Sequence, residues 1–172
     1  MARKLIKRYL PNHEWFKTQK SLQILGSWAY DPNLWHLNRY SVSAGVFIGL
    51  FVAFIPLPTQ MLMAGLFAIL FRANLPISVI LVWVTNPVTM APMFYMAYEV
   101  GSTIIGGPDK EFVFELSWEF LGQLAHFWEP FLLGCFLCGL FFGLLGSATA
   151  RILWRWHVVK RWHERRLKRK KN

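Results

Sequence analysis

The side chains best suited to chemistry gather at two breaks in otherwise apolar sequence, residues 55–60 and 85–89. Each break contains proline, which removes a backbone donor and moves the preceding residue out of helical geometry. Nearly all the hydrogen-bonding side chains of these segments stand at the breaks: Thr59, Gln60, Thr85, Asn86 and Thr89. Because none of them is charged, they are suited to holding a ligand by hydrogen bonds.

Helices that begin at Thr59 and Pro87 would direct free N–H groups and positive dipole ends into one region, where an anion can be held without a charged side chain. The alternative is that these side chains only cap each other's helix ends, and the two interpretations have equal weight because capping and binding use the same atoms. Arg72, at the edge of its apolar run, favours an anchor role, since its head can reach water. The predicted substrate-binding set is Pro58, Thr59, Gln60, Arg72, Thr85, Asn86, Pro87 and Thr89.

The sequence contains no constellation typical of an enzyme or a metal site. His126 and Glu129 share a helix face, but no third ligand stands at metal-binding spacing. No Ser-His-Asp set, glycine-rich phosphate loop or paired-carboxylate signature appears. Cys135 and Cys138 lie among apolar residues, which favours small residues at a helix contact over thiol exchange. We expect no enzymatic activity, no catalytic residue, no cofactor and no bound metal.

The elements that must position the two breaks lie in long stretches without charge. Of the 172 residues, 55% are hydrophobic and 16% are charged, and no Asp, Glu, Lys, Arg or His occurs in 41–71, 73–98 or 130–150. Each stretch matches or exceeds the roughly 20 apolar residues that cross a hydrocarbon core of about 30 Å. A soluble helical protein would need charges on the outer faces of its helices. We therefore predict an all-α integral membrane protein.

Charge predicts the sides of the membrane. The net charge of +10 is concentrated in the segments 1–40 and 151–172, whereas 106–129 contains five acidic residues and one Lys. Lys and Arg that flank spans are retained in the cytoplasm. We predict a multi-pass protein of the bacterial inner (cytoplasmic) membrane, with both termini cytoplasmic. The predicted domains are a basic cytoplasmic or interfacial segment (1–40), a membrane core with two helix breaks (41–105), an acidic external loop (106–129), a transmembrane helix (130–150) and a basic cytoplasmic tail (151–172).

The first apolar stretch predicts a re-entrant hairpin. As one helix, its residues 41–71 would be about 46 Å long, which exceeds the hydrocarbon thickness. The prolines divide it into halves that are each too short to span. We therefore expect a hairpin that enters from the cytoplasm and returns to it, with two tilted short spans as the alternative. The second stretch, 73–98, predicts one crossing by a discontinuous helix, and 130–150 predicts the return crossing.

Five short motifs, in this order, resemble one bacterial membrane family. They are Asp-Pro-Asn-Leu-Trp at 31–35, Gly-Val-Phe-Ile-Gly at 45–49, Pro-Leu-Pro-Thr-Gln at 56–60, Arg-Ala-Asn-Leu-Pro at 72–76 and Thr-Asn-Pro-Val-Thr at 85–89, with Pro92 after them. The sequence resembles the family catalogued as domain of unknown function 2062 over about 32–107. The resemblance implies a bacterial inner-membrane protein and supplies no activity or catalytic residue. The proline-broken pairs are also similar to those of DedA-type lipid-transport families, although the acidic residues expected of such proton-coupled carriers are absent from the apolar stretches.

These observations favour two functions from different classes. The first is a small membrane transporter or flippase-like protein for an anionic amphiphile such as a phosphate-bearing lipid. The second is a non-transporting membrane anchor or assembly factor that docks lipids or partner proteins. The basic, Trp-containing tail has a composition that suits nucleic acid, but its attachment to a membrane span favours anionic lipid headgroups, at about 1 kcal/mol per cation. Expected partners are therefore membrane lipids with anionic headgroups and no nucleic acid, and a homo-oligomer is left open.

Overall fold

The structure, a computed structural model, describes residues 32–35, 37–105 and 118–171. Its elements are one short 3-10 helix and five α-helices: η2 (Pro32–Trp35), α4 (Arg39–Ala53), α5 (Gln60–Leu70), α6 (Leu75–Val82), α7 (Pro87–Ile105) and α8 (Trp118–Lys171). These described residues contain no strand, so the predicted all-α class is confirmed for them. The predictions for 1–31 and 106–117 lie outside the described residues.

Asparagine side chains start three of these helices. The Asn38 side chain accepts from Ser41 N at the start of α4, in a reciprocal capping box with the Ser41 side chain. The Asn74 side chain accepts from Ile77 N at the start of α6, where Pro76 stands within the first turn. Asn86 does the same for α7. The local sequence therefore specifies where these three helices begin, by satisfying backbone donors that have no partner within the helix.

The turn between α5 and α6 depends on a left-handed residue at Arg72, whose φ is 50°. Ala73 N donates to Ala68 O at 2.8 Å and Arg72 N donates to Ile69 O at 3.1 Å. This pair of hydrogen bonds is the Schellman motif, in which the left-handed position is usually glycine. The turn sends the chain back along α5 as α6.

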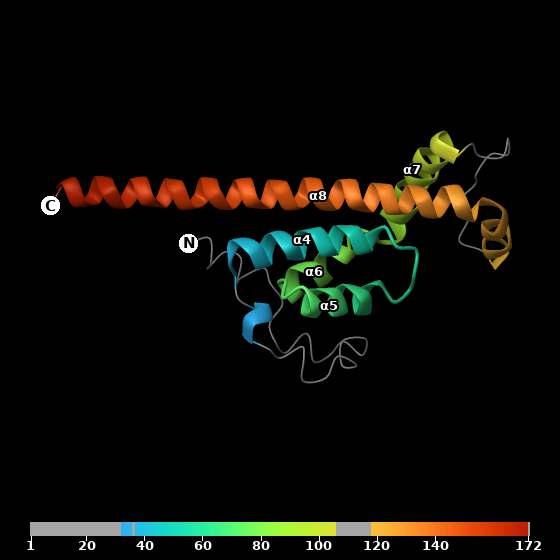
Figure 1. Cartoon of the computed structure of the whole chain (residues 1–172), viewed down its shortest axis with the longest axis horizontal. Coiled ribbons are helices and arrows are strands. Elements are labelled where there is room, and N and C mark those ends of the chain that lie inside the picture. Colours follow the sequence, from blue (N-terminus) through green and yellow to red (C-terminus); the bar gives the residue numbers. More distant parts are fainter. Residues whose placement is uncertain (1–31, 36, 106–117, 172) are drawn as a thin grey trace.

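The helices form a hairpin layer covered by one long helix (Figure 1). Helices α4, α5 and α6 lie side by side, and each contacts the other two. Helix α8 lies along α4, whereas α7 is bent by 85° from α6 and crosses α8. The layer therefore places the α4–α5 connection and the α6–α7 bend at the same end (Figure 1).

Small residues permit the closest contacts between these helices. A Cβ atom added at Gly49 would lie 2.6 Å from Ser78 O, and one at Gly134 would lie 1.7 Å from Ala97 O. The backbones of α4 and α6, and of α7 and α8, are therefore in direct contact. Cys135 and Cys138 are buried and unbridged in the cluster between α7 and α8, which confirms their predicted role as small contact residues.

The described chain contains one helix that is long and apolar enough to cross a membrane, the 37-residue Trp128–Glu164 part of α8. The bent pair α6 and α7 would be a second if the two helices form one broken span. Helices α4 and α5 are apolar but shorter, with 15 and 11 residues. The predicted helix breaks are confirmed as helix ends, whereas the multi-pass topology stays a prediction.

Helix α8 does not stop where the predicted domains change. It runs without interruption from Trp118 to Lys171, with Pro130 inside it, and so joins part of the predicted external loop, the predicted span and the predicted tail. The reason is that a change from apolar to charged side chains leaves the backbone hydrogen bonds of a helix in place and so does not end it. No Gly or Pro follows Gly146, so nothing in the tail breaks the helix.

Candidate functional site

The two helix breaks meet through one glutamine and one threonine. Gln60 Nε2 donates to Ile55 O, and it lies 3.4 Å from Ala53 O, so the amide closes the end of α4. Thr85 Oγ1 donates at 2.8 Å to Val82 O and lies 3.3 Å from Gln60 Oε1. The structure therefore brings Gln60 and Thr85 together, and we call the region around these two residues the junction.

The second break is closed by its own side chains. Asn86 Oδ1 accepts from Val88 N at 2.9 Å and from Thr89 N at 3.1 Å, while Asn86 N donates to Thr89 Oγ1 at 3.0 Å. Thr89 Oγ1 also contacts Val84 O. This is a reciprocal capping box. For Asn86 and Thr89 the geometry therefore matches the capping interpretation, and a ligand there would have to replace hydrogen bonds within the chain.

The first break differs because the start of α5 has no such cap. The N-cap residue Thr59 makes no side-chain capping hydrogen bond. Thr59, Pro58 and Pro87 are all exposed. The first turn of a helix presents N–H groups without partners inside the helix. At the junction, the first N–H of α5, that of Gln60, donates to the backbone oxygen of Leu57 at 3.3 Å, and no side chain caps the donors that follow it. The donors of α7, in contrast, are occupied by side chains.

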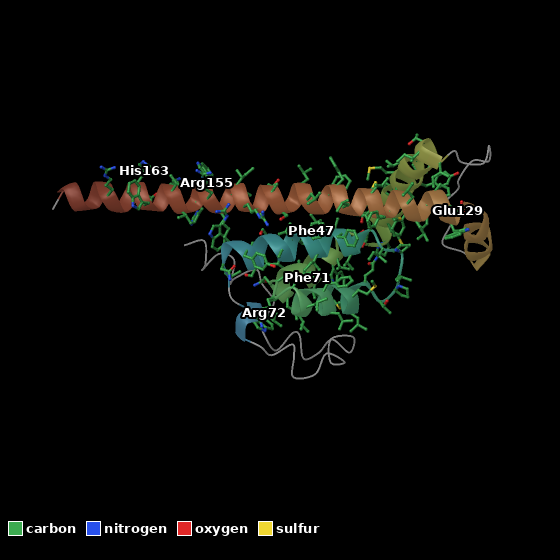
Figure 2. All side chains as sticks on the ribbon, in the orientation of Figure 1. Phe47, Phe71, Arg72, Glu129, Arg155 and His163 are labelled. Carbon is green, nitrogen blue, oxygen red and sulfur yellow. The ribbon has the colours of Figure 1, made fainter. Side chains whose placement is uncertain are left out.

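Arg72 lies apart from the other seven predicted residues. It follows the last turn of α5, at the opposite end of an 11-residue helix from Gln60, a rise of about 16 Å. Figure 2 shows Arg72 beside Phe71, at the end of the hairpin away from residues 54–59. The Arg72 side chain is exposed there. The structure therefore does not bring Arg72 to the junction.

A second polar cluster, which sequence reasoning missed, lies at the Arg72 end of the hairpin. Asn74 is fully buried, and its N–H donates to Ser41 O at 2.9 Å. The Ser78 hydroxyl lies 3.2 Å from Gly45 O and 3.1 Å from Asn74 O. These contacts join the start of α6 to α4 through backbone atoms. The signal available in the sequence was Asn74 before Leu75-Pro76, a helix-start pattern.

The same end of the hairpin is tied to α8 by an arginine. Arg151 Nε donates to Ser43 Oγ at 3.2 Å, and Ser43 Oγ donates to Tyr40 O at 3.1 Å. The Tyr40 hydroxyl donates to Phe71 O at 3.3 Å, which links α4 to the end of α5. These hydrogen bonds therefore fix the positions of α4, α5 and α8 relative to one another.

Within the described residues, no group of three or more His, Cys, Asp or Glu side chains could hold a metal ion. The polar atoms at the junction are amide and hydroxyl groups, which bind by hydrogen bonds. The arrangement can hold a polar or anionic group, and it offers no described nucleophile with an activating base.

The chain matches, over residues 22–163, the family described as uncharacterized proteins conserved in bacteria, domain of unknown function 2062. No curated protein and no solved structure matches the chain. The matched region contains both helix breaks and most of α8. Because the match covers most of the 172 residues, this chain belongs to that bacterial family.

Proposed function

We propose that this chain is a small transporter or flippase-like protein of the bacterial inner membrane that handles an anionic amphiphile, such as a phosphate-bearing lipid. The observation that carries the proposal is the meeting of two helix breaks at Gln60 and Thr85. Paired interruptions in apolar segments are the sequence feature that best indicates a transporter site. Both breaks place uncharged polar side chains, such as Gln60 and Thr85, between the ends of apolar helices.

The packing of α4 on α8 supports a junction deep in the bilayer. Arg151 bonds to Ser43 near the start of α4, whereas Gly139 faces Phe51 and Phe54 at its end. From Arg151 to Gly139, α8 rises about 18 Å. Half of a hydrocarbon core is about 15 Å. If Arg151 stands at the cytoplasmic headgroups, the α4–α5 connection lies close to the bilayer centre.

This depth supports the proposed topology. Helices α4 and α5 are a re-entrant hairpin from the cytoplasm, α6 and α7 are one broken crossing, and α8 is the return crossing. Non-helical backbone at membrane depth is tolerated only where protein or a water-filled cavity covers it. The exposed residues of the first break therefore face a cavity or another polar surface, which is what a substrate headgroup requires.

The junction has the chemistry for an anionic head with an apolar tail. The start of α5 has no side-chain cap, so the first turn beyond Gln60 N, which donates to Leu57 O, offers N–H donors and the positive end of a helix dipole. Exposed apolar side chains continue along α5, with Leu66 and Leu70 exposed by 49% and 72%. A headgroup at Thr59 would therefore have an apolar track beside it. At the cytoplasmic end of the hairpin, the exposed cations Arg39, Arg72 and Arg151 are placed to attract anionic lipid headgroups.

A second candidate is a membrane anchor or assembly factor that does not transport. The observation that favours it is the closed capping box of Asn86 and Thr89, which occupies donors that a substrate would need. In this case the Gln60–Thr85 contact serves only to hold two helix ends together.

Lipid movement in vesicles separates the two candidates. The purified protein is reconstituted with a fluorescent phosphatidylglycerol, and an impermeant reductant bleaches the label in the outer leaflet. We expect faster transfer of inner-leaflet label than in empty vesicles, and its loss in Gln60→Leu and Thr85→Val at unchanged protein levels. Thr149→Val is the matched control, because Thr149 makes a similar hydroxyl bond to a helix carbonyl, Leu145 O, away from the junction. Wild-type protein that moves no label, or junction variants that only lose folded protein, would favour the second candidate.

A further inference from the structure

The part of α8 beyond Arg151 carries a stripe of exposed apolar side chains. Ile152 and Trp156 are each exposed by 67% and Val159 by 44%. Their spacing of four and then three residues places them on one face of the helix. Figure 2 shows this part of α8, with Arg155 and His163, extending past the ends of the other helices. We call Ile152, Trp156 and Val159 the tail stripe.

Cations border the tail stripe on both sides. Arg155 and Lys160 stand one residue from Trp156 and Val159, and all four are exposed. The Lys160 ammonium lies 5.9 Å from the centre of the Trp156 ring, and the Arg166 guanidinium lies 5.4 Å from that of Trp162. An apolar stripe with cationic borders is complementary to an apolar surface with acidic borders.

We propose that the tail stripe is a docking surface for an acidic amphipathic helix of a partner protein on the cytoplasmic side of the membrane. Three apolar side chains in consecutive turns are the anchors that such a helix buries. Arg155 and Lys160 would pair with its acidic border. The proposal needs α8 to cross the membrane, but it does not need the chain to transport anything.

The charges of this chain argue against its own segments as the occupant. A second parallel copy would bring the Arg155 and Lys160 borders of two helices together, and like charges in such positions repel. Residues 1–31 hold six Lys or Arg against two Asp or Glu, so they are also basic. The described part of the acidic segment, 118–129, is the opposite end of α8, where Figure 2 labels Glu129. The complementary charge must therefore come from another molecule.

The continuity of α8 argues for a protein rather than the lipid surface. The helix passes from the candidate span into the tail without a break, and Figure 1 shows this part straight. Trp156 and Val159 lie about 8 and 12 Å beyond Arg151 along the axis. The surface potential of a membrane decays within about 8 Å at physiological salt. A bilayer crossed by a straight helix therefore contacts only the part of the stripe next to Arg151. The part around Val159 is left for a partner that lies alongside the helix.

Site-directed spin labels on the full chain in nanodiscs with phosphatidylglycerol test which occupant is correct. With the native cysteines replaced, one label is placed at Val159→Cys on the stripe and a matched label at Val158→Cys, which is exposed outside it. We expect both labels to be accessible to a water-soluble relaxation agent. Addition of a synthetic helix with a leucine stripe and glutamate borders is expected to immobilise the label at 159 and leave that at 158 mobile. A label at 159 that is accessible to oxygen but shielded from water would identify the lipid surface, and dipolar broadening between copies would identify a dimer. Either result overturns the proposal.

Affinity for the same synthetic helix provides the second measurement. Trp156→Ser removes a stripe anchor and Lys160→Glu reverses a border charge. We expect Trp156→Ser to weaken binding more than about tenfold, as for a central interface residue, and Lys160→Glu to weaken it by repelling the acidic border of the helix. Val158→Ser should leave it unchanged. Because the side chains of Trp156, Val158 and Lys160 are all exposed, we expect the variants to keep the fold, which their elution profile checks. Wild-type protein that does not bind the helix, or equal losses in Val158→Ser, would refute the docking surface.

Discussion

Substitution of Gly134 by alanine tests the crossing of α7 and α8. A Cβ atom at Gly134 would lie 1.7 Å from Ala97 O, and contacts under 3.0 Å are essentially absent for real Cβ atoms. The helices would have to separate by about 1.3 Å along that line, and both groups in conflict are backbone. Overpacking costs about 1–3 kcal/mol, with the upper part expected for a rigid contact. Alanine regains about 1 kcal/mol of helix propensity over glycine. We therefore expect Gly134→Ala to be less stable by about 2 kcal/mol.

The assay is the loss of monodisperse protein on heating in detergent, read by size-exclusion chromatography. Gly146→Ala in the same helix is the matched control, because its Cβ would meet Leu50 Cδ1 at 2.4 Å, the mobile end of a side chain that can rotate away. The control gains the same propensity without a backbone conflict, so it should be at least as stable as the wild type. If Gly134→Ala also melts at or above the wild-type temperature, the two backbones are not in contact at this crossing.

Three further predictions follow from the helix ends and the charge distribution. Arg72→Gly should raise stability by about 1 kcal/mol in the same heating assay, because glycine adopts a positive φ without the Cβ penalty; a loss would show that the guanidinium contributes more than the turn. Asn86→Ala should cost about 1 kcal/mol and Asn86→Asp much less, since only alanine removes the cap; equal losses would contradict the capping role. A cysteine at Lys110 should react with an impermeant reagent from outside intact cells, and one at Lys168 only after permeabilisation; labelling of both from one side would refute the proposed topology.

The helix breaks were predictable because proline acts on the residues next to it. The predicted helix starts at Thr59 and Pro87 differ from the observed ones by no more than one residue, and both follow from the missing backbone donors of proline. The position of the neighbouring uncharged polar residues at helix ends was predictable for the same local reason. What charge alone left open was the membrane path of these short helices.

Other features depend on contacts between distant residues or on exceptions to local preference. The sequence offers no sign that Asn74 N bonds to Ser41 O, because the bond requires α4 and α6 to be packed already. Arg72 in a left-handed conformation is an exception to the usual glycine, and the compact Schellman turn compensates for it. Arg72 belongs to the predicted set because a charged residue near membrane depth is a functional candidate. The length of α5 separates it from the junction.

The two ends of the hairpin differ in how they are held, and this difference bears on function. At the Asn74 end, backbone bonds and glycine contacts join α4 to α6, and the polar atoms are buried. At the junction, the breaks are joined by the 3.3 Å contact between Gln60 and Thr85, and Pro58 and Thr59 are exposed. Buried apolar residues stand next to these exposed ones: Val52, Ala53 and Phe54 are buried, and the Phe54 ring stacks on Phe142 with centroids 5.5 Å apart. The junction therefore combines a packed apolar side with an exposed polar side, and the exposed side is where the proposed headgroup would compete with Thr85 for Gln60.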